Sequence, residues 1–217
     1  MDFDTIDGEL VTGLLLLLLI GLGPKIALVP FLEKTHGMDA ATKREIGTRM
    51  VTIAVVTALI LFLAGAFLMK LLHITGGAVS IGGGIVLMLL ALKMTLRPEE
   101  PPVRADEGAE KAIDHHQLAV YPLAVPYLLN PVGMTVLIVA SDKVSSIWGY
   151  LLVIALVLLV GAFDMLVFRN TDKLAKRLTP TKMIVSEIVF GILLTAVAVQ
   201  LIAYGLAAYG VIDPLGH

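Results

Sequence analysis

The sequence predicts an all-α membrane protein of six transmembrane helices, built as two inverted three-helix repeats with helices 1 and 4 broken near mid-membrane. Three observations carry this prediction: the apolar composition, the alternating charge of the connections, and an offset shared by two pairs of residues. Of the 217 residues, 58% are hydrophobic and 16% charged, whereas soluble domains have about 25% charged residues. The bilayer is therefore the expected partner of most side chains.

Six apolar stretches are each long enough to cross about 30 Å of hydrocarbon at about 1.5 Å per residue. A charged, Pro-rich segment separates the first three from the last three, and we expect it to be a linker on the cytoplasmic side. The predicted units are residues 1–96, the linker 97–116, and residues 117–217. The predicted spans are residues 10–32, 50–72, 75–96, 118–140, 146–168 and 182–209.

The connections between these stretches alternate in charge. Three segments, 33–49, 93–116 and 169–182, contain 13 of the 16 Lys and Arg residues. Basic loops stay in the cytoplasm. We therefore expect a multi-pass protein of the cell (inner) membrane with both termini outside the cytoplasm.

Two pairs of residues reveal the internal repeat. Pro24 and Pro131 are 107 residues apart, and so are Gly84 and Gly191. One offset thus aligns two separate spans of the two halves. A three-span unit repeated in tandem has its second copy upside down, which is a common transporter arrangement.

The prolines of the first and fourth spans predict where these helices break. Proline removes a backbone donor and clashes with the preceding turn. Asn130 before Pro131 resembles a fresh helix start, as does Gly23 before Pro24 to a lesser degree. Two such N-termini in mid-membrane would bind a carboxylate, and the preceding carbonyls an ammonium, so the pair suits a zwitterion. Alternatively, both prolines only kink helices for packing.

Glycines are expected to bring backbones close to this site. Gly82, Gly83 and Gly84 follow Ser80 in the third span, and Gly133 follows Pro131. Small residues let helices approach closely. Packing is one interpretation, and the other is that the broken first span lies on this surface, where the substrate contacts backbone.

Two charged residues lie within apolar runs, where a charge is costly unless paired or able to reach the interface. Lys25 follows Pro24, and Asp164 is in the fifth span. Lys25 either extends its stem to the cytoplasmic face or takes part in substrate or counter-ion binding. We hypothesise a Lys25–Asp164 pair. The predicted substrate-binding residues are Gly23, Pro24, Lys25, Ser80, Gly83, Asn130, Pro131, Gly133 and Asp164.

Several classes of function lack support in the sequence. With no cysteine, the chain has no disulfide framework and no thiolate site. We find no catalytic triad order, phosphate loop or metal-ligand motif, and we expect no enzyme activity, cofactor, metal or nucleic-acid partner. The oligomeric state stays open, because the glycines could serve internal packing or contact between subunits of a homo-oligomer.

The motifs together resemble the MarC family. They cover the Pro24 region, the span 3 glycines, the Pro122 to Gly133 segment and Gly191 to Gln200. The resemblance implies six spans, an inverted repeat and kinship with LysE-like exporters, and for some members the transport of glycine or alanine.

Four positions depart from the pattern of that family. It usually has Asn-Pro in span 1 and Gly-Pro in span 4, whereas this chain has Gly23-Pro24 and Asn130-Pro131. Ser80 stands where the family tends to have Arg, Lys93 where it has Asp, and Lys25 where it has an apolar residue. The substrate is therefore the least transferable property.

The resulting hypothesis is a secondary transporter of a small zwitterionic or anionic solute, a small neutral amino acid above all, that works by alternating access. A proton or sodium ion could drive it, and the sequence does not identify which. The alternative is a passive channel, or a membrane-embedded interaction subunit without a transport cycle.

Overall fold

The computed structural model describes residues 8–96, 115–171 and 180–213, and each regular element within these ranges is helical. The predicted linker lies mostly outside them, although His115 and His116 begin a short helix. In chain order the elements are α1 (Gly8–Gly21), α2 (Pro24–Lys34), α3 (Ala40–Leu72), α4 (Gly76–Thr95), α5 (His115–Leu118), the irregular segment η1 (Ala119–Leu128), α6 (Pro131–Lys143), α7 (Ile147–Arg169) and α9 (Pro180–Ala208).

The helices are long and apolar enough for a multi-pass membrane protein. Five segments of the described chain qualify as membrane spans, or six if the bent pair His115–Leu128 and Pro131–Lys143 counts as one. The first span, Leu10–Lys34, includes both α1 and α2. The largest difference from the predicted ranges is at α3, which begins ten residues early, at Ala40 rather than residue 50.

The extra turns of α3 have a local cause. The Asp39 side chain caps this helix by accepting hydrogen bonds from the N–H groups of Ala41 and Thr42, at 3.0 and 3.2 Å. Such a cap starts a helix without help from apolar burial. The polar first turns therefore extend α3 beyond the apolar run from which its start was predicted.

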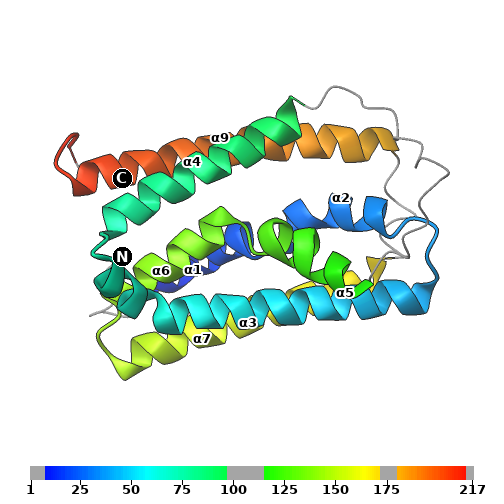
Figure 1. Cartoon of the computed structure of the whole chain (residues 1–217), viewed down its shortest axis with the longest axis horizontal. Coiled ribbons are helices and arrows are strands. Elements are labelled where there is room, and N and C mark those ends of the chain that lie inside the picture. Colours follow the sequence, from blue (N-terminus) through cyan, green and yellow to red (C-terminus); the bar gives the residue numbers. More distant parts are fainter. Residues whose placement is uncertain (1–7, 97–114, 172–179, 214–217) are drawn as a thin grey trace.

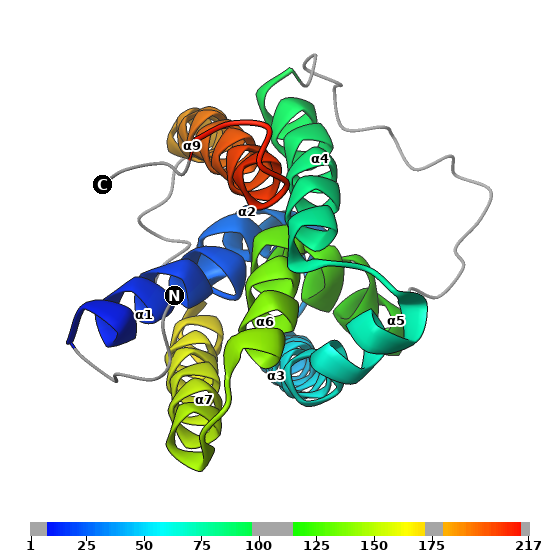
Figure 2. The ribbon, with the colours of Figure 1, turned by 90° about the vertical axis from the view of Figure 1, so that its left-hand side faces the viewer.

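The helices lie in one bundle in which neighbours run in opposite directions. The colours of Figure 1 show α1, α2, α4 and α7 running one way and α3, η1, α6 and α9 the other. Figure 2 shows α6 near the centre of the bundle, where it contacts α1, α3 and α4. The two halves are not separate bodies, because α4 of the first packs along α9 of the second.

Glycines allow α4 and α9 to approach closely. A Cβ atom on Gly84 would lie 2.8 Å from the carbonyl oxygen of Ala198, and one on Gly191 would lie 3.1 Å from that of Ala91. Gly84 and Gly191 are 107 residues apart, and so are Ala91 and Ala198. The two contacts are therefore equivalent under the offset found in the sequence.

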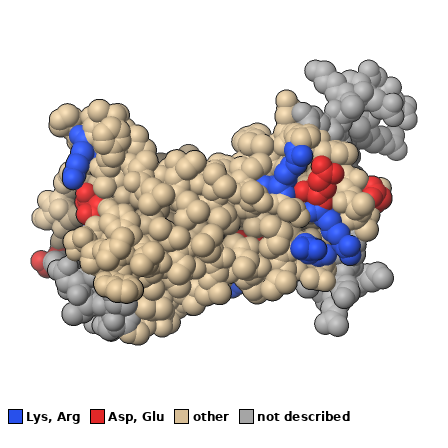
Figure 3. Space-filling model, turned by 90° about the horizontal axis from the view of Figure 1, so that it is seen from below, with Lys and Arg blue, Asp and Glu red and all other residues tan. Residues whose placement is uncertain are grey.

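Charged side chains gather at the two ends of the bundle. Figure 3 shows them at both ends of one face, separated by an uncharged middle. One end holds the termini of α2, α4 and α7 and the start of α3. The described basic residues of that end, which we call the basic end, are Lys34, Lys43, Arg44, Arg49, Lys93 and Arg169.

Candidate functional site

The first interruption lies between α1 and α2. Pro24 occupies the first position of α2, where its missing N–H costs nothing, and Gly23 precedes it in an extended conformation (φ −85°, ψ 164°). A Cβ atom on Gly23 would overlap the carbonyl oxygen of Leu19. Only glycine fits this position without movement of the α1 backbone.

The second interruption lies between η1 and α6, where the chain bends by 70°. Pro131 again opens the new helix, and Asn130 caps it. The Oδ1 atom of Asn130 accepts hydrogen bonds from the N–H groups of Val132 and Gly133, at 2.8 and 3.3 Å. Asn130 thus acts as the predicted N-cap of α6.

Asn130 also ties the two interruptions together. Its Nδ2 donates to the carbonyl oxygen of Ile20 at 2.7 Å, and its backbone N–H donates to that of Gly21 at 2.9 Å. These carbonyls belong to the last turn of α1, which has no further helical N–H to bond them. One fully buried residue therefore satisfies the end of α1 and the start of α6.

Backbone contact completes this junction. A Cβ atom on Gly21 would overlap backbone atoms of Gly133, and one on Gly133 would overlap the carbonyl oxygen of Gly21. Both glycines are buried. We call the contact of Ile20 and Gly21 with Asn130 and Gly133 the α1–α6 junction.

The two new helix starts differ in their chemistry. Asn130 occupies the first amides of α6, so the expectation that both N-termini present free N–H groups is wrong for this helix. The start of α2 has no side-chain cap, because Gly23 has no side chain to supply one. The positive end of the α2 dipole is therefore the one that a bound anion could meet.

The structure does not form the hypothesised Lys25–Asp164 pair. The Nζ atom of Lys25, an exposed residue, lies 5.8 Å from the centroid of the Phe190 ring on α9. Asp164 is fully buried, and neither of its carboxyl oxygens has a hydrogen-bond partner among the described residues.

The helical positions explain why this pair fails to form. Phe31 of α2 packs against Phe168 of α7, with ring centroids 5.1 Å apart, and Asp164 lies one turn before Phe168. Lys25 is six residues before Phe31, so it projects about 120° away around α2. Depth along the two spans was estimated from sequence, but the direction of the side chains around each helix was not.

The span 3 glycines pack on a different helix from the one expected. A Cβ atom on Gly83 would overlap the hydroxyl oxygen of Thr135 on α6. The expected neighbour of this surface, the broken first span, is wrong, because α6 contacts both α1 and α4 and lies between them. Ser80, one turn earlier on α4, is half-buried.

Two participants were not singled out from the sequence. Gly21 meets Gly133, and buried Thr135 meets Gly83. Gly21 had a signal, since it forms Gly-Leu-Gly-Pro with the residues that follow. Thr135 had none, because its role depends on a contact between distant helices.

The comparisons with known proteins agree with this architecture. Residues 9–209 match the family described as MarC family integral membrane protein. This chain belongs to the MarC family. Its MarC relatives include a UPF0056 membrane protein of Methanocaldococcus jannaschii, 29% identical over 85% of this chain and 90% of the relative. Another is the UPF0056 inner membrane protein YhgN of Escherichia coli K12, 28% identical over 91% and 96% of the two chains. No solved structure matches this MarC protein.

Proposed function

We propose that this MarC family protein is a secondary transporter of a small zwitterionic solute, with small neutral amino acids as the expected cargo. It would work by alternating access around the two helix interruptions. The observation that carries the proposal is the α1–α6 junction, where the interrupted spans of both halves meet.

The symmetry of the α4–α9 contacts supports an inverted repeat. Gly84 meets Ala198 and Gly191 meets Ala91, and the 107-residue offset exchanges these two contacts. The helices of the first half also run opposite to their counterparts in the second. An inverted repeat supplies two related conformations, open to opposite sides of the membrane, which alternating access requires.

Packing at the junction suggests that this conformation is closed. The backbones of Gly21 and Gly133 touch, which leaves no room for a solute between them. For a solute to pass at this depth, α1 and α6 must separate. We infer that the hydrogen bonds of Asn130 to Ile20 and Gly21 hold the closed state.

The groups near the start of α2 favour a zwitterion. The uncapped amides of α2 and the Lys25 ammonium attract a carboxylate. Asp164, about two turns further along the bundle and without a partner, would attract an ammonium group or carry a coupling proton or sodium ion. The nine residues named from the sequence remain the proposed binding set.

The distribution of charge supports an orientation. The basic end of the bundle belongs in the cytoplasm by the positive-inside rule, which puts both termini outside. The name of the Escherichia coli relative describes an inner membrane protein. We propose the same membrane for this chain.

Counterflow in proteoliposomes tests the proposed transport. Vesicles preloaded with unlabelled glycine or alanine are diluted into labelled substrate, and internal label is followed over time. A carrier takes up more label when preloaded, whereas a passive channel shows no such stimulation and an interaction subunit shows no movement. Failure of every small amino acid tried would reject the proposed cargo.

Replacing Asp164 by asparagine is expected to lower counterflow by about tenfold or more, because a charge-assisted hydrogen bond contributes about 1.5–3 kcal/mol. The variant should fold at least as well as the wild type, since it removes a buried, unpartnered carboxyl group. Asp142→Asn, at an exposed position near the end of α6, is the control. Wild-type counterflow in Asp164→Asn would remove this residue from the mechanism.

A further inference from the structure

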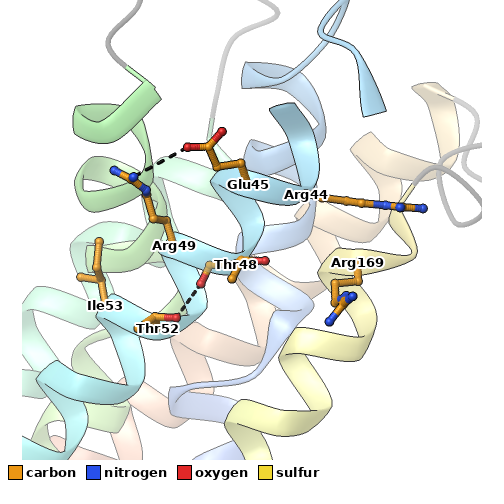
Figure 4. Close-up of a pocket in the computed structure, with 7 residues that line it drawn as sticks. All are labelled: Arg44, Glu45, Thr48, Arg49, Thr52, Ile53 and Arg169. Carbon is orange, nitrogen blue, oxygen red and sulfur yellow. Dashed lines mark hydrogen bonds and ion pairs between the residues drawn. The ribbon is translucent and has the colours of Figure 1, made fainter. Parts of the chain in front are cut away.

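A polar hollow lies at the basic end, well away from the α1–α6 junction. It has a volume of about 460 Å³ and is formed by the start of α3 and the end of α7. Figure 4 shows Arg44 and Arg169 on one side of Thr48, and Arg49 with Glu45 on the other. Its lining residues are Arg44, Glu45, Thr48, Arg49, Thr52, Ile53 and Arg169.

The hollow carries an excess of positive charge. Three guanidinium groups oppose one carboxylate, and the ion pair of Arg49 with Glu45 is long, at 3.7 Å. Arg49 also lies 3.0 Å from Nε2 of His116. Arg44 and Arg169 form no ion pair with any residue that the structure describes. The hollow therefore keeps two uncompensated arginines, whose planar groups suit the oxygens of a phosphate.

An exposed apolar stripe continues from this hollow along α3. Beyond Thr52, the same face of the helix presents apolar side chains at intervals of three or four residues. All of them are exposed, and they run toward the uncharged middle of the bundle. They are Val56, Ile60, Leu63 and Phe67.

We propose that this hollow binds the headgroup of an anionic phospholipid. The phosphate lies among Arg44, Arg49 and Arg169, the hydroxyl groups of Thr48 and Thr52 supply further donors, and an acyl chain follows the α3 stripe. Basic pockets between helices at a membrane surface have the chemistry to bind such headgroups. A free phosphate shares the headgroup chemistry but would gain nothing from the stripe, which is why we assign a lipid.

Thermal unfolding and native mass spectrometry of the full chain in neutral detergent test this proposal. The additions are phosphatidylglycerol, phosphatidylcholine and inorganic phosphate. We expect phosphatidylglycerol to raise the melting temperature and to remain bound in the spectrometer, while the other two do neither. Equal stabilisation by inorganic phosphate or by phosphatidylcholine would overturn the assignment to an anionic lipid.

Matched charge variants locate the site. Arg44→Gln/Arg49→Gln/Arg169→Gln should weaken phosphatidylglycerol binding by about fivefold per arginine. Lys34→Gln/Lys93→Gln/Lys143→Gln removes the same charge at exposed positions outside the hollow and should leave binding near the wild-type level. If the triple arginine variant does not fold, Arg44→Gln/Arg169→Gln spares the contacts of Arg49. Unchanged binding in the arginine variants, or an equal loss in the lysine variant, would overturn the proposal.

Discussion

Replacing Gly133 by valine is expected to destabilise the protein more than any other single substitution considered for this chain. The new Cβ atom would overlap the carbonyl oxygen of Gly21. That oxygen is part of the α1 backbone, so the overlap is relieved only if a whole helix shifts. Overpacking costs about 1–3 kcal/mol even where side chains adjust, so we expect at least the upper part of this range. Thermal unfolding in detergent, followed by the helical circular dichroism signal, measures the loss.

Gly82→Val provides the matched control. Gly82 lies in α4 and is exposed, and a Cβ atom added to it would have no neighbouring atom within 4 Å. The same glycine-to-valine change in a helix should therefore be nearly neutral here. At about 2–4 °C per kcal/mol for a chain of this size, Gly133→Val should melt several degrees lower. Equal melting temperatures for the two variants would show that α1 and α6 are not in close contact.

Much of the fold follows from local properties of the sequence. Each predicted span coincides with a helix or a pair of successive helical segments, since apolar length and loop charge are properties of neighbouring residues. The cap on α6 was equally local, because Asn130 directly precedes Pro131. The early start of α3 was missed because Asp39 acts through a cap, which the apolar run does not include.

The site depended on contacts that no local pattern specifies. Nothing beside Asn130 in the sequence indicates that its amide reaches the carbonyl of Ile20, 110 residues away. The proposed partner of Lys25 was wrong because the directions of side chains around two helices depend on how these helices pack. The neighbour of Gly83 was wrong for a similar reason, since α6 lies between α1 and α4.

Replacing Asn130 by alanine is expected to have the second largest effect. The change leaves the carbonyl of Ile20 and the amides of Val132 and Gly133 without this partner in a buried site. Each unsatisfied buried group costs about 1–3 kcal/mol, so we expect a loss of about 3 kcal/mol or more. Thermal unfolding measures this loss, and counterflow should also change, because the closed state loses the bonds that hold it.

Two further variants separate the roles of this side chain. Asn130→Asp keeps an oxygen to cap α6 but loses the donor to Ile20, so it isolates the link between the helices. Gly23→Asn/Asn130→Gly moves the asparagine to the other interruption, as in the pattern that the MarC resemblance implies. We expect no rescue, because a Cβ atom at position 23 would overlap the carbonyl oxygen of Leu19. If the exchanged protein were as stable as the wild type, the two interruptions would be interchangeable, and the structural role assigned to Asn130 would be wrong.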